Sequence, residues 1–64
     1  MDAYRATGLA EGWIETEQMD DIIEAWQYLH DTGLAYRLQG WFGRTATSLL
    51  EQGVIHHRTK YDAS

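Results

Sequence analysis

The 64-residue chain is long enough for one domain only, and a domain of this size buries only about 60% of its unfolded surface, so the margin of stability is thin. The absence of cysteine excludes disulfides and thiolate metal sites, and three Trp, four Tyr and one Phe favour self-association as the supplement to the core. The net charge of −5 argues against general nucleic-acid binding, because that binding is driven by releasing counterions from phosphates.

The chain starts without a basic segment followed by an apolar run, and no stretch approaches the roughly 18 apolar residues of a membrane span. We therefore expect a cytoplasmic protein without membrane association. The charge is uneven: residues 1–32 carry eight acids and one base, whereas residues 33–64 carry four bases and two acids. This asymmetry suits head-to-tail association of copies or another partner of complementary charge.

Residues 1–15 are expected to form a short N-terminal arm of the single domain 1–64. Asp2 to Thr7 can form one helical turn that ends at Gly8, and residues 12–15 can lie extended across the rest of the molecule.

Residues 16–32 are predicted to form an acidic helix, with Thr16 as its N-cap and acids near the positive end of its dipole. Apolar residues at three-and-four spacing predict a buried stripe: Met19, Ile22, Ile23, Trp26 and Leu29. The residues left for solvent are Glu24, Gln27 and Asp31. Gly33 is the expected left-handed residue that ends the helix.

Residues 34–52 are predicted to form a second helix, which ends at Gly53 in the same way. Its core face is Ala35, Leu38, Phe42, Thr45, Ala46 and Leu49. Two helices joined by a short link form an antiparallel hairpin. The predicted fold class is therefore mainly all-α, a helical hairpin with an N-terminal arm that assembles into a homo-oligomer.

Residues 54–64 are predicted to form a polar tail. His56, His57 and Arg58, with Lys60, form a basic patch that is either exposed or contributes to an anion site. A zinc site would need two more well-placed ligands, and only His30 and scattered carboxylates remain, so no metal site is predicted.

Two glycines in the second helix call for an explanation, because Gly40 and Gly43 each cost about 1 kcal/mol relative to Ala in a helix. On a helical wheel they share a side with Tyr36 and Thr47 and would form a groove. The groove would allow either close packing of another helix or binding of a flat ligand. The two interpretations coincide if the groove lies at a subunit interface.

Arg37, Trp41 and Arg44 follow one another at i, i+4 and i+7, with Ser48 one turn further. Guanidinium groups suit bidentate contact with phosphate or carboxylate, and an indole can stack on a base. The structural alternative is that Trp41 fills an interface while the two arginines pair with the acidic helix, at Asp20, Asp21 or Glu24.

Catalytic patterns are absent from the sequence, which has no Cys, no Gly-rich phosphate loop and no G-x-S-x-G. Ser48 with His30 or His56 as base is the one conceivable nucleophile arrangement. We therefore expect a protein that is not an enzyme and needs no cofactor.

The run AWQYLHDTGLAYRLQGWFGRTATSLLEQGVI, residues 25–55, resembles a family of very small tailed-bacteriophage proteins of unknown function with an LQGWFGRTA-type motif. The resemblance covers about half of the chain and brings no known catalytic or binding residues. It implies a phage accessory protein in the bacterial host cytoplasm.

Three functions are compatible with these features. The leading one is an oligomeric anti-defence protein that sequesters a nucleotide-type signal or another anionic small molecule at Arg37, Trp41, Arg44 and the basic patch. The second is an inhibitor that binds a host protein or mimics DNA through the acidic residues Glu17, Asp20, Asp21, Glu24 and Asp31. The third is a purely structural assembly protein.

Overall fold

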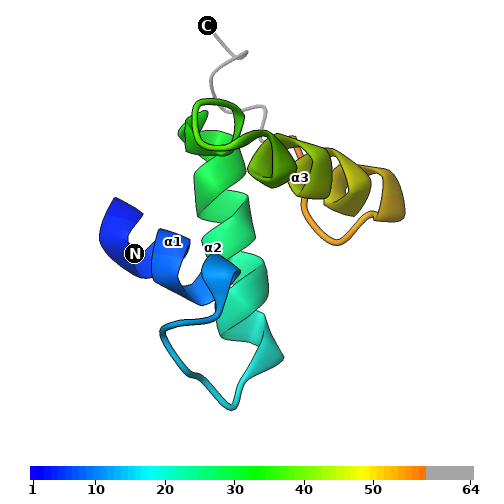
Figure 1. The fold of residues 1–64 in the computed structure, drawn as a ribbon. Coiled ribbons are helices and arrows are strands. Elements are labelled where there is room, and N and C mark those ends of the chain that lie inside the picture. The colour runs from blue at the N-terminus through cyan, green and yellow to red at the C-terminus, as the bar shows by residue number, and fades with distance from the viewer. Residues whose placement is uncertain (58–64) are drawn as a thin grey trace, which may run out of the picture.

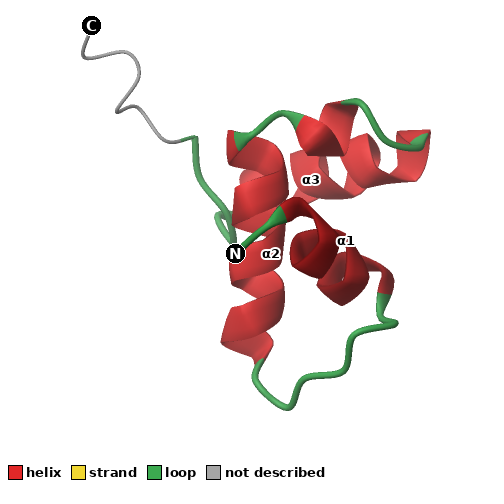
Figure 2. Ribbon diagram, turned by 90° about the vertical axis from the view of Figure 1, so that its left-hand side faces the viewer, coloured by secondary structure: helices red, strands yellow, loops and turns green. Residues whose placement is uncertain are grey.

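The computed structural model describes residues 1–57, which contain α1 (Ala3–Glu11), α2 (Met19–Asp31), the 3₁₀ turn η1 (Leu34–Tyr36) and α3 (Gly40–Gln52). These residues include no strand, and the mainly helical class is confirmed. In both ribbon views α1 and α3 lie across α2, with α3 nearer the C-terminal end of α2 (Figure 1; Figure 2). Among the helices of this part of the chain, none has the length and apolar character needed to cross a membrane.

The N-terminal arm is more ordered than expected. The carboxylate of Asp2 caps α1 by accepting a hydrogen bond from the N–H of Arg5 at 2.8 Å, and the helix continues through Gly8 to Glu11. The sequence suggested that the helix ends at Gly8, but Gly8 lies inside it. The role of this glycine is to make room for the side chain of Ile14, which lies directly over it. A Cβ at Gly8 would stand 2.5 Å from Ile14 Cγ1, so glycine is needed there for close packing.

The acidic helix starts later than predicted, at Met19 rather than near Thr16. The Thr16 hydroxyl accepts from the N–H of Gln18 at 3.1 Å and donates to Asp21 Oδ2 at 2.7 Å. Thr16 therefore organises the loop before α2 instead of capping it. The end of α2 is as predicted, since Gly33 has a left-handed backbone with φ of 80°.

The prediction of a single helix over residues 34–52 is wrong, because these residues form η1 and α3 with a break between them. The N–H of Leu38 still bonds the carbonyl oxygen of Leu34 at 3.0 Å, but Gln39 is extended, with φ of −59° and ψ of 152°. The chain changes direction at this point, and α3 lies across α2 instead of running back along it (Figure 1). This arrangement replaces the expected antiparallel hairpin.

One core joins the helices, and its buried members come from α1, α2, η1, α3 and the segment after α3: Ala6, Leu9, Ala25, Trp26, Leu29, Ala35, Phe42, Ala46 and Ile55. Leu38, placed on the core face by the helical wheel, is instead 37% exposed. The ring of Trp26 meets that of Phe42 at a centroid distance of 5.8 Å.

The first residues of the expected tail belong to the fold. Ile55 is fully buried, and the backbone of His56 is held by the side chain of Gln27. Gln27 was predicted to face solvent, but it is only 7% exposed. The prediction was wrong because the helical period does not reveal the polar partner that this residue meets in the folded chain.

Candidate ligand-binding site

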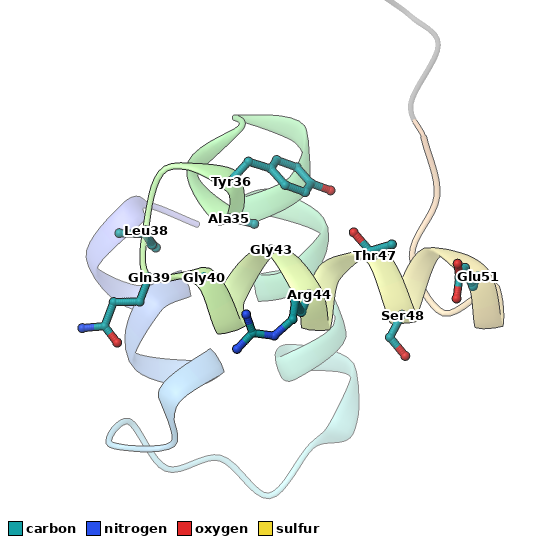
Figure 3. Close-up of a pocket in the computed structure, with 10 residues that line it drawn as sticks. All are labelled: Ala35, Tyr36, Leu38, Gln39, Gly40, Gly43, Arg44, Thr47, Ser48 and Glu51. Atoms are coloured by element: carbon teal, nitrogen blue, oxygen red, sulfur yellow. The ribbon is translucent and has the colours of Figure 1, made fainter.

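A shallow pocket of about 470 Å³ lies along one side of α3 and against η1. We call it the α3 pocket. Figure 3 shows its lining residues: Ala35, Tyr36, Leu38, Gln39, Gly40, Gly43, Arg44, Thr47, Ser48 and Glu51. The groove predicted from Tyr36, Gly40, Gly43 and Thr47 is therefore present, although a turn and a shorter helix build it instead of one continuous helix.

Arg44 supplies the positive charge of the α3 pocket. Its side chain lies along the wall toward Gly40, where an added Cβ would be 3.2 Å from Arg44 Nη1 (Figure 3). Within residues 1–57, Arg44 makes no hydrogen bond or ion pair, and its side chain is exposed. An unpaired guanidinium beside a hollow can form bidentate hydrogen bonds with a phosphate or carboxylate group.

Neither Gly40 nor Gly43 is fixed by a close contact with another helix. A Cβ at Gly43 would lie 3.6 Å from both the carbonyl oxygen of Ala35 and Tyr36 Cδ1, which is ordinary van der Waals separation. At Gly40 the nearest atom is the end of the flexible Arg44 side chain. Packing inside the chain therefore does not require glycine at either position, in contrast to Gly8.

Tyr36 forms the upper wall of the α3 pocket and is linked to two histidines. Its hydroxyl is hydrogen-bonded to His30 Nδ1 at 2.7 Å, and the ring of His30 lies 4.9 Å from that of His57, centroid to centroid. Burial raises the pKa of Tyr36 above its ordinary value of 10.0. Burial, reinforced by the charge of His57 and opposed by that of Asp31, lowers the pKa of His30 below 6.5.

Of the predicted stripe of Arg37, Trp41 and Arg44, Arg44 lines the α3 pocket and the other two residues do not. Trp41 stacks on Phe42 with ring centroids 4.0 Å apart, and its indole N–H donates to Gln39 Oε1 at 3.3 Å. Arg37 is exposed at the end of η1 and does not line the α3 pocket. The break after η1 separates residues that a continuous helix would have aligned.

The remaining predicted residues lie away from the α3 pocket. Glu17, Asp20, Asp21 and Glu24 occupy the start of α2 and the loop before it, and Asp31 accepts a hydrogen bond from Gln27 at 2.9 Å. His56 is engaged through its backbone, and Arg58 falls outside the described residues. The described residues contain no group of three or more His, Cys, Asp or Glu side chains placed to hold a metal ion.

Two polar lining residues escaped the sequence-based prediction. Glu51 stands seven positions after Arg44, so its carboxylate lies on the same side of α3 and brings a negative charge to the far end of the α3 pocket (Figure 3). A wheel extended by one turn beyond Thr47 would have found it. Gln39 could not have been predicted as a lining residue, because it lies at the break between η1 and α3, where a continuous helix was expected.

The comparisons with known proteins place the chain in one family. A family model described as a domain of unknown function, DUF7417, matches residues 9–62. No curated protein and no solved structure matches the chain. The matched residues include α2, α3 and the whole α3 pocket, and the chain belongs to the DUF7417 family.

Proposed function

We propose that this protein is a non-enzymatic binding protein whose α3 pocket takes a small anionic ligand of nucleotide type. The observation that carries the proposal is the exposed guanidinium of Arg44, which pairs with no group of residues 1–57 and lies beside a floor where Gly40 and Gly43 have no side chains. Gly43 lies inside α3, where glycine costs about 1 kcal/mol relative to Ala, and packing within residues 1–57 does not require it. Space for a bound molecule accounts for this glycine.

The lining groups suit the parts of a nucleotide. Arg44 can bind phosphate in bidentate fashion, and the hydroxyls of Thr47 and Ser48 can donate further hydrogen bonds to it. Tyr36 offers the only aromatic ring among the lining residues, against which a base can pack. Glu51 can accept hydrogen bonds from sugar hydroxyls or an exocyclic amine.

The proposed biological role follows from the resemblance to small phage proteins. A phage accessory protein in the host cytoplasm could bind and withhold a nucleotide signal made by a host defence system. The α3 pocket is open to solvent along one side (Figure 3), and a second copy of the chain covering that side would enclose the ligand. We therefore propose a homo-oligomer whose subunit interface contains the site.

A titration tests the role of Arg44. Mono- and cyclic dinucleotides are titrated into the protein and followed by calorimetry, with Arg44→Ala as the test variant and Arg5→Ala as the charge-matched control. We expect micromolar or tighter binding of at least one nucleotide, a loss of about tenfold or more for Arg44→Ala, and no loss for Arg5→Ala. Equal affinities for the two variants, or no binding of any nucleotide, would contradict the proposal.

A further inference from the structure

A second hollow, which we call the α2–α3 groove, lies between those helices on the side of α3 away from the α3 pocket. Its volume is about 350 Å³, and its walls are mostly apolar: Met19, Ile22, Ile23, Trp26, Leu49 and Val54. Met19 stands at the groove with 67% of its surface exposed, although it belongs to the apolar stripe of α2. A flexible thioether at an open apolar groove suits contact with a partner of variable shape.

Carboxylates border the α2–α3 groove on one side. Asp20 and Glu24 line an adjoining hollow that shares Ile23 and Val54 with the groove. Both carboxylates are exposed, and neither forms a hydrogen bond or ion pair with any residue of the described part of the chain. The groove therefore combines an apolar floor with an uncompensated negative rim.

We propose that the α2–α3 groove binds an amphipathic helix of a partner protein, one that carries Lys or Arg beside its apolar face. Helix-in-groove recognition uses apolar anchors at i, i+3 or i+4, and i+7, and the apolar side chains that α2 and α3 present in the groove can receive such anchors. The basic residues of the partner would face Asp20 and Glu24, and this charge complementarity sets the chemistry of the partner.

The same charges argue against a second copy of this chain as the occupant. Two copies that met groove to groove would bring the Asp20 and Glu24 carboxylates of both chains together. Two acidic rims repel each other at low ionic strength, whereas a basic helix is attracted; this argument concerns the groove and not an interface at the α3 pocket. The site is independent of the α3 pocket, so either proposal can fail without the other.

Two helical peptides of roughly 18 residues test the proposal. They share one leucine face and differ in having lysine or glutamate beside it. Each is titrated into the isotope-labelled full chain while backbone amides are followed by NMR. We expect the lysine peptide to shift the amides of Ile23, Leu49 and Val54, and the glutamate peptide to leave them unchanged.

Charge-matched variants distinguish contact with the Asp20 and Glu24 carboxylates from general attraction to a negatively charged protein. Asp20→Lys with Glu24→Lys should weaken the lysine peptide by about tenfold or more, whereas Glu11→Lys with Glu15→Lys, the same change of net charge elsewhere, should weaken it by less than about threefold. Met19→Ala, at a largely exposed position, should also weaken binding by about tenfold without unfolding the protein.

Three results would overturn the proposal. The first is that the lysine peptide does not bind, or shifts amides outside the groove. The second is that the two double variants lose affinity equally. The third is that the groove amides shift with protein concentration before any peptide is added, which would make a second copy the occupant.

Discussion

The side chain of Gln27 holds the segment after α3 against α2. Its amide nitrogen donates to the carbonyl oxygen of His56 at 2.7 Å, and its amide oxygen accepts from the N–H of the same residue at 3.0 Å. Gln27 also donates to Asp31, so its buried polar atoms are satisfied and burial costs little. The sequence could not predict this arrangement, because the two residues are 29 positions apart and no local pattern links them.

His30, in the last turn of α2, is expected to make the stability of the fold depend on pH. In the folded protein its pKa is lowered from 6.5, first by burial and then by the charge of His57. Because the unfolded chain binds a proton more readily, stability from this group is complete above pH 6.5 and is lost as the pH falls toward the lowered pKa. In the protonated imidazole Nδ1 carries a hydrogen, so His30 would be the donor in its hydrogen bond with Tyr36.

We therefore predict that His30→Asn reduces the acid sensitivity of the fold. The free energy of unfolding is measured in urea at about pH 5.5 and about pH 7.5 for the protein, for His30→Asn and for the control His56→Asn. The difference between the two pH values should shrink for His30→Asn only, because His56 contributes its backbone rather than its imidazole. An unchanged difference in His30→Asn would show that another group controls the response.

The ends of the helices were predicted better than their extents. Gly53 has φ of 79°, and Val54 donates to the carbonyl oxygen of Leu49 at 2.9 Å, which is the predicted Schellman ending. Such endings depend on neighbouring residues and can be identified locally. The division of residues 34–52 depends on how η1 packs against α2, and the apolar spacing of that segment fits either a turn or a helix.

Substitution by alanine should have opposite effects on stability at Gly8 in α1 and at Gly43 in α3. Gly43→Ala should raise the free energy of unfolding by roughly 0.5–1 kcal/mol, because the added methyl fits and the unfolded chain loses freedom. Gly8→Ala should lower it by roughly 1–3 kcal/mol, because the methyl overlaps Ile14.

Urea unfolding of both variants, with nucleotide titration of Gly43→Ala, checks this prediction. If the α3 pocket binds a ligand, Gly43→Ala gains stability while it loses affinity, because its methyl occupies the floor. A Gly43→Ala variant that is destabilised would show that close packing, rather than a ligand, explains the glycine.

At the scale of the whole molecule, α3 presents the α3 pocket on one side and the α2–α3 groove on the other. The helical wheel correctly grouped Gly40, Gly43 and Thr47, which belong to one helix, and Tyr36 joins them across the break because η1 packs against α3 near Gly43. The wheel also placed Arg37 and Trp41 beside Arg44, but neither lines the α3 pocket. Arg37 lies before the break, and Trp41 stacks on Phe42. The glycine side of α3 could be placed from sequence, whereas the break after η1 and the ring contacts of Trp41 required the tertiary structure.

Native mass spectrometry of protein produced in a bacterial host, under conditions that keep small molecules bound, tests the central claim most directly. We predict a homo-oligomer that carries extra mass in the nucleotide range, and loss of that mass in Arg44→Ala. A bare monomer, or an oligomer whose bound mass is unaffected by Arg44→Ala, would contradict the proposal that the α3 pocket binds a nucleotide.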